Sequence, residues 1–115
     1  MIRPRTISIW VGLLALTLAG CRGAVVGKWS LERARPNREV FAIDAAEFRS
    51  DGSYQATTTI EGRTQHEHGA FRFNGFTLTL RPEGGGQRAY EATVGPRRME
   101  LRAKDKQHVV LRRER

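Results

Sequence analysis

The sequence predicts an all-β protein, an antiparallel up-and-down meander of about eight strands that closes into a small barrel. From Val25 onward, apolar and polar residues alternate with a period of two in short segments, as in half-buried strands. These segments recur roughly every 8–12 residues and are separated by turns rich in Gly, Asn and Asp. No segment has a convincing helical pattern, and short hairpin connections favour up-and-down order over Greek-key crossings.

The first four expected strands cover residues 25–32, 39–50, 54–61 and 64–73. Three consecutive threonines in the third segment are β-branched and favour strand over helix. Asp51-Gly52 marks a tight turn before that segment. The stretch Leu31–Glu39 contains Pro36-Asn37, a loop signal, and is expected to be the one irregular connection.

The last four expected strands cover residues 76–81, 88–94, 98–104 and 107–115. Asn74-Gly75 is the strongest hairpin signal in the chain, because both residues tolerate a positive φ. It places Phe76, Leu78 and Leu80 on the inward face of the strand that follows. The segment PEGGGQ, residues 82–87, is too rich in glycine to be anything but a loop.

The interior of an eight-stranded barrel is either filled by side chains or holds one small ligand. The inward faces carry large side chains that could fill it: Phe48, Tyr54, Phe71, Phe73, Phe76, Tyr90 and Met99. If the barrel is hollow, a small apolar or amphipathic ligand is expected to contact Tyr54, Phe71, Phe73 and Tyr90.

The chain begins like an export signal. MIRPR carries two arginines and no acid, and an apolar core from Ile9 to Ala19 follows it. At ~1.5 Å per residue this core is too short for a hydrocarbon layer of ~30 Å, so a signal peptide is predicted in place of a permanent membrane helix.

The signal ends in LAGC, residues 18–21, which resembles the lipobox of bacterial lipoproteins at every position. The resemblance implies a signal peptide over 1–20, a diacylglyceryl group on Cys21, a lipidated tether over 21–24 and a domain over 25–115. Several acyl chains, palmitate among them, would make a durable membrane anchor, since one chain alone anchors only marginally. By resemblance to enterobacterial sorting, Arg22 favours a cell-envelope location on the outer membrane, facing the periplasm.

Cys21 has two alternative interpretations. It could be a free thiol within an ordinary secretory signal, or the odd cysteine of a disulfide between two chains. An internal disulfide is excluded, because the chain contains a single cysteine. The oligomeric state stays open.

The chain is basic, with 20 Lys and Arg residues against 12 Asp and Glu. Removing Arg3 and Arg5 with the leader leaves 18 against 12, a formal charge of +6. Such a charge attracts anionic partners such as lipid head groups or lipopolysaccharide, and the expected compartment argues against nucleic acid. The arginines are spread along the sequence, which also fits an ordinary solvated surface.

The mature chain resembles the small bacterial lipocalin-like domains, relatives of the calycin barrels. The resemblance rests on GKW at residues 27–29, on the segment FRSDGSY…NGFTLTL at residues 48–80 and on VVLRRE near the end. It implies that Trp29 plugs the closed end of the barrel and that Arg113, or else Arg112, packs across its indole. Gly27 is the glycine of the family's G-x-W motif. The chain lacks the C-terminal helix and the second motif of lipocalins proper.

A metal site or an active site is only weakly indicated. His66 and His68 share one face of a strand, with Glu67 on the other, and His108 could be a third ligand. The alternative is that both histidines lie on the outer face, opposite Phe71. No nucleophile elbow or phosphate loop occurs, so neither an enzyme nor a cofactor is expected.

Two functions remain after these exclusions. The first is a lipid-anchored envelope protein whose lipocalin-like barrel binds a small apolar or amphipathic ligand. The second is a solid-cored interaction module that contacts anionic envelope components or a protein through its basic surface.

Overall fold

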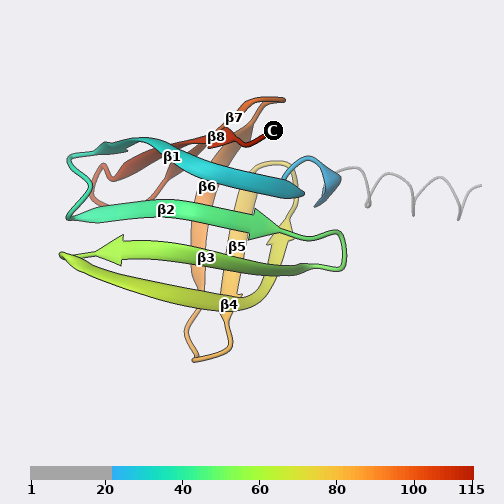
Figure 1. Ribbon diagram of the computed structural model, residues 1–115, viewed down its shortest axis with the longest axis horizontal. Helices are drawn as coiled ribbons and strands as arrows, with labels where there is room; N and C mark the ends of the chain where they lie inside the picture. Colours follow the sequence, from blue (N-terminus) through green and yellow to red (C-terminus); the bar gives the residue numbers. More distant parts are fainter. Residues whose placement is uncertain (1–21) are drawn as a thin grey trace, which may run out of the picture.

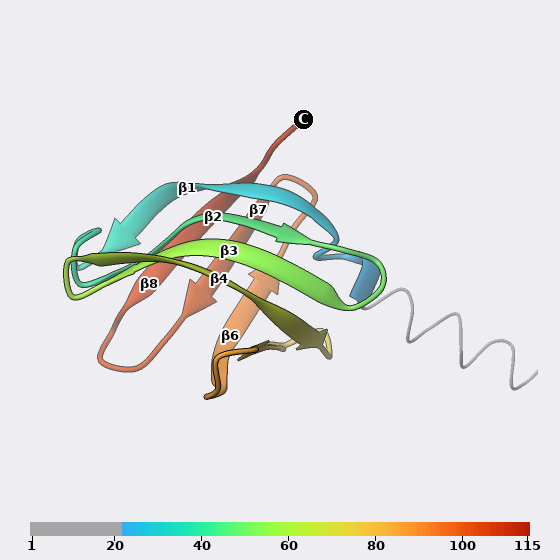
Figure 2. The same cartoon turned by 60° about the horizontal axis from the view of Figure 1, so that its bottom comes forward.

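The computed structural model describes residues 22–115, and the expected leader and Cys21 lie outside them. Eight strands follow one another in a closed antiparallel barrel, in which the first strand pairs with the last (Figures 1 and 2). The all-β meander predicted from the alternation of residues is therefore confirmed. No helix within residues 22–115 is long and apolar enough to cross a membrane.

The strands are β1 (Gly27–Arg35), β2 (Phe41–Phe48), β3 (Ser53–Ile60), β4 (Arg63–Phe73), β5 (Thr77–Pro82), β6 (Arg88–Val94), β7 (Arg98–Arg102) and β8 (His108–Arg113). Strands β1 to β4 run side by side, and β5 and β6 cross their direction at a steep angle (Figure 1). All neighbours are antiparallel, so every second connection lies at the same end of the barrel.

The two ends of the barrel differ in what they contain. The N-terminal end, where β1 begins, carries residues 22–26, the turns 49–52, 74–76 and 95–97, and residues 114–115. The far end carries the connections 36–40, 61–62, 83–87 and 103–107. Figure 2 shows the chain entering the barrel beside the turn that joins β2 to β3.

Two expectations from the sequence were wrong. Residues 31–35 are not part of an irregular connection, because β1 continues to Arg35 through a register shift between Leu31 and Arg33 that preserves its pairing with β8. Phe76 does not point inward but is 79% exposed. The turn after β4 is one residue longer than Asn74-Gly75, because Asn74 Oδ1 accepts hydrogen bonds from the backbone N–H groups of both Phe76 and Thr77.

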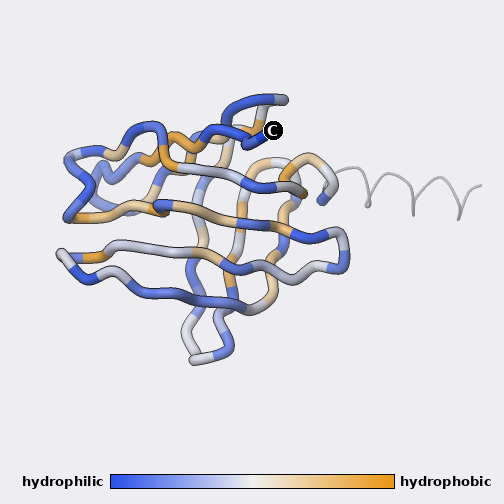
Figure 3. Tube along the Cα trace, viewed as in Figure 1, coloured by the Kyte–Doolittle hydropathy of each residue, from blue (hydrophilic) through white to orange (hydrophobic). Residues whose placement is uncertain are grey.

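The core fills the barrel with side chains from all eight strands, helped by Val25 just before β1. Its largest fully buried members include Trp29, Tyr54, Phe48 and Ile43. Along the backbone, apolar and polar residues alternate, except that β4 is hydrophilic over much of its length (Figure 3). This polar stretch places one charged side chain, that of Glu67, in the barrel interior.

Candidate functional site

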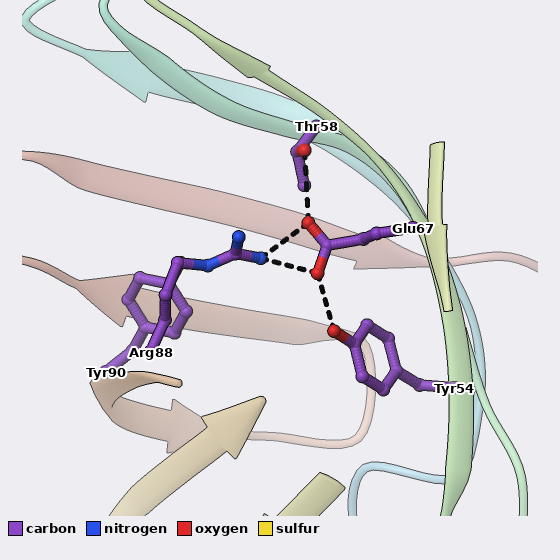
Figure 4. Close-up of polar contacts among 5 residues, drawn as sticks. All are labelled: Tyr54, Thr58, Glu67, Arg88 and Tyr90. Atoms are coloured by element: carbon purple, nitrogen blue, oxygen red, sulfur yellow. Dashed lines mark hydrogen bonds and ion pairs between the residues drawn. The ribbon is translucent and has the colours of Figure 1, made fainter. Parts of the chain in front are cut away.

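Five residues form a polar cluster inside the otherwise apolar barrel (Figure 4). Strand β3 supplies Tyr54 and Thr58, β4 supplies Glu67, and β6 supplies Arg88 and Tyr90. All five face inward because strand side chains alternate, and each shares its face with buried neighbours on the same strand.

Glu67 lies at the centre of the polar cluster. Its Oε1 and Oε2 accept hydrogen bonds from Arg88 Nη2 at 2.6 and 2.7 Å. Tyr54 donates its hydroxyl to Oε2 at 2.5 Å, and Thr58 donates its hydroxyl to Oε1 at 3.2 Å. The two carboxylate oxygens thus receive four hydrogen bonds, which matches their accepting capacity.

Arg88 links Glu67 to the second tyrosine. Its Nε donates to the hydroxyl of Tyr90 at 2.8 Å. Burial is the largest effect and opposes the charge of Arg88, but the interactions with Glu67 and Tyr90 together outweigh it and raise the pKa of the guanidinium above its ordinary value. The ion pair is only partly shielded from water, since the side chain of Arg88 is 30% exposed and that of Glu67 is 12% exposed.

Both tyrosines of the polar cluster stay protonated at neutral pH. Burial raises the pKa of Tyr54, and its hydrogen bond to the Glu67 carboxylate raises it further. Burial likewise raises the pKa of Tyr90, against the opposing effect of Arg88. With the carboxylate saturated by donors and the phenols held neutral, the polar cluster contains no free general base.

The polar cluster ties β4 to β6 across the intervening strand β5. Every buried side-chain nitrogen and oxygen atom in residues 22–115 has a hydrogen-bond partner. A buried charge pair is tolerated when all its polar atoms are hydrogen-bonded, because unpaired polar groups in an apolar interior are costly. The polar cluster therefore helps to fill the barrel interior, with all its buried polar atoms hydrogen-bonded.

The residues expected to line a ligand are packed against the core. Tyr54, Phe71 and Tyr90 are buried, and Phe73 is half-buried against the core. Phe48 lies 5.0 Å from Phe71 and 6.0 Å from Tyr54 between ring centroids. Three hollows of the described chain lie on its outer surface, and none of them is lined by these four residues.

Sequence reasoning placed Glu67 opposite the two histidines but assigned it no function. The signal that could have identified it was available, because Glu67 shares the two-residue period of the inward-facing Phe71. Arg88 offered no comparable signal, since it lies twenty-one positions further along the chain, on a strand that does not pair with β4.

The N-terminal end is closed by Trp29 and Arg113, the residues indicated by the lipocalin resemblance. Trp29 is fully buried and donates its Nε1–H to the Val25 carbonyl at 2.9 Å. The Arg113 guanidinium lies over the indole, 4.3 Å from the ring centroid. It also donates to the carbonyl oxygens of Val26 at 2.6 Å and Ala24 at 2.8 Å.

The surroundings of Gly27 explain why the G-x-W pattern has a glycine two positions before Trp29. Its φ is +138°, and a Cβ at this position would lie 2.6 Å from Arg113 Nη1. A side chain here would therefore displace the guanidinium from its carbonyl partners. Arg112, the alternative partner for Trp29, instead donates to Glu32 on the outer surface at 2.6 Å.

An arginine-rich cleft of about 1300 Å³ opens on the surface beside this closed end. It is lined by Arg97, Arg98, Arg112, Arg113 and Arg115, and Glu114 is the one acidic residue of its lining. Arg98 and Arg112 share the carboxylate of Glu32 just outside the lining, and the hydrogen bond from Arg112 lowers the pKa of this carboxyl. The fold thus brings together two groups of arginines, one at the start of β7 and one at the end of β8.

His66 and His68 lie on the outer face of β4, opposite Phe71. The Nδ1 of His66 is 3.0 Å from the hydroxyl of Thr57, and the Nδ1 of His68 is 3.4 Å from Glu83. His108 is on β8, next to Glu100. Within residues 22–115, no three His, Cys, Asp or Glu side chains are grouped so that they could hold a metal ion.

No protein-family model and no curated protein matches the chain. The fold is similar to the crystal structure of an uncharacterized protein from Bacteroides eggerthii, with a TM-score of 0.56 and 14% sequence identity. The match covers 78% of this chain and 99% of that one. At this level of identity the similarity supports the small β-barrel fold alone.

Proposed function

We propose that the protein is a lipid-anchored lipoprotein of the cell envelope, whose filled barrel acts through its basic outer surface. The observation that carries this proposal is the way the chain enters the barrel. The residues that directly follow the lipobox cysteine are fixed to the barrel by Arg113, which binds the carbonyl oxygens of Ala24 and Val26.

This attachment leaves almost no linker between the anchor and the folded domain. Val25 is fully buried, only four positions after Cys21. A protein displayed on so short a tether works at the membrane surface itself. The envelope location, on the outer membrane facing the periplasm, is inferred from the LAGC motif and from Arg22, as the lipoprotein resemblance implies.

The filled interior favours action through the exterior. The polar cluster has its hydrogen bonds satisfied, and the aromatic side chains pack against one another. The outer surface carries the net positive charge of the mature chain and forms the arginine-rich cleft. An anionic component of the envelope is the partner class that this charge attracts.

Metabolic labelling with palmitate tests the anchor. The full-length chain expressed in a bacterial host should incorporate the label and lose residues 1–20, whereas Cys21→Ser should do neither, because the acceptor sulfur is gone. Label that persists in Cys21→Ser, or a wild-type chain that takes up none, would contradict the proposal.

A small amphipathic ligand at the barrel mouth is a second candidate, and one observation favours it. Arg88 is partly exposed, and its Nη1 makes no hydrogen bond within residues 22–115. An anionic head group could bind there. A fluorescent fatty acid should then bind the wild type and bind Arg88→Gln more weakly; no displacement and no thermal shift across a lipid panel would count against it.

A further inference from the structure

We infer that the N-terminal end of the barrel is a membrane-contact surface, where the arginine-rich cleft binds the anionic head groups of the phospholipid leaflet that carries the anchor. The inference rests on the proposed lipid anchor and adds the orientation of the domain and the chemistry of its partner.

The tether sets the orientation. Three residues of extended chain span at most about 11 Å, so an acylated Cys21 stays within that distance of Ala24. Ala24 is held at the N-terminal end by Arg113. The anchored barrel must therefore present this end, and not the far end, to the membrane.

The charges of the two ends differ in the direction that this orientation requires. The segments of the N-terminal end contain four basic residues, Arg22, Arg49, Arg97 and Arg115, against two acidic ones, Asp51 and Glu114. The connections of the far end contain three basic residues against four acidic ones. Only the end next to the anchor carries an excess of positive side chains.

The arginine-rich cleft adds to this excess at the ends of the neighbouring strands. Arg98 and Arg112 share the single carboxylate of Glu32, which leaves these three side chains with a net positive charge. Arg97 and Arg115 are exposed and form no ion pair within residues 22–115. Guanidinium groups bind phosphate oxygens in a bidentate manner, so this surface fits phospholipid head groups better than a surface of lysines would.

Vesicle binding by the unacylated chain tests the inference separately from the anchor. The barrel is formed entirely within residues 22–115, so the chain 21–115 with an alkylated Cys21 contains the whole fold. It should sediment with phosphatidylcholine vesicles that contain phosphatidylglycerol, and not with phosphatidylcholine alone. Added salt should release it, because exposed charges are screened.

A pair of matched double variants locates the contact. Arg97→Gln/Arg115→Gln should weaken binding roughly 30-fold, since each basic residue near an anionic surface contributes about one factor of five. Arg63→Gln/Arg81→Gln removes the same charge from exposed positions toward the far end and should leave affinity within about twofold.

Equal losses in the two double variants would show that net charge alone drives binding, and would overturn the inference. Failure to prefer phosphatidylglycerol would overturn it as well. Because the assay uses no acyl chain, either result leaves the palmitate test of the anchor unaffected.

Discussion

Replacing Arg88 with methionine tests the energetic role of the polar cluster. The variant leaves the Glu67 carboxylate inside the barrel with Tyr54 and Thr58 as its remaining donors. Breaking a fully buried ion pair costs about 3–5 kcal/mol, whereas an exposed pair is worth about 0–1 kcal/mol. The side chains of Glu67 and Arg88 are 12% and 30% exposed, so a loss of about 2–3 kcal/mol is expected.

Glu67→Gln completes a double-mutant cycle. The amide oxygen can still accept the hydrogen bond from Tyr54, and Arg88 can turn toward water, so this variant should cost about 1–2 kcal/mol. In Glu67→Gln/Arg88→Met no charge remains inside the barrel. The double variant should therefore be more stable than the sum of the single losses predicts, by about 1–2 kcal/mol.

Urea unfolding of residues 21–115 supplies the assay, with Trp29 as the only tryptophan of this segment. Arg81→Met is the matched control, because Arg81 is exposed on β5, and it should change the free energy of unfolding by less than about 0.5 kcal/mol. The reasoning is refuted if Arg88→Met costs no more than Arg81→Met, or if the two single losses simply add.

Three further predictions use the same unfolding measurement. Arg113→Lys should cost about 2 kcal/mol, because lysine cannot cover Trp29 while binding the carbonyl oxygens of Ala24, Val26 and Pro96, to which Arg113 donates. Arg112→Lys should stay within about 0.5 kcal/mol, and equal effects would exclude a special role for Arg113. Gly69→Ala should cost about 2–3 kcal/mol, because its Cβ would lie 2.1 Å from the Arg81 carbonyl oxygen, whereas Gly84→Ala has open space and should be nearly neutral. Because the folded state raises the pKa of Tyr54 above its ordinary value of 10.0, the contribution of Tyr54 to stability should be constant below about pH 10 and decline above it, as tyrosines ionise more readily in the unfolded chain. Tyr54→Phe should flatten that decline, and an unchanged slope would show that Tyr54 does not cause it.

Local alternation was enough to predict the barrel, because one buried face dictates the two-residue period of every strand. Prediction from local alternation was wrong where a single extra residue changes the register of a strand. The Leu31/Arg33 bulge extends β1, and the extra residue in the turn after β4 exposes Phe76. Both depend on pairing and turn hydrogen bonds that the hydrophobic pattern does not encode.

The surface could be predicted less well than the interior. Arg22, Arg49, Arg97 and Arg115 are far apart in sequence and look like scattered surface charge. They share one end only because successive antiparallel strands return the chain there at every second connection. The pairing of Trp29 with Arg113 was indicated by the lipocalin resemblance, since no spacing rule connects residues at opposite ends of the chain.

Intact-mass and peptide mass spectrometry of the protein extracted from the membranes of its native host tests the central claim most directly. The account predicts a mature chain that begins at Cys21 and carries a diacylglyceryl group on its sulfur and an acyl group on its amine. A chain that retains residues 1–20, or a Cys21 that carries no lipid, would contradict it.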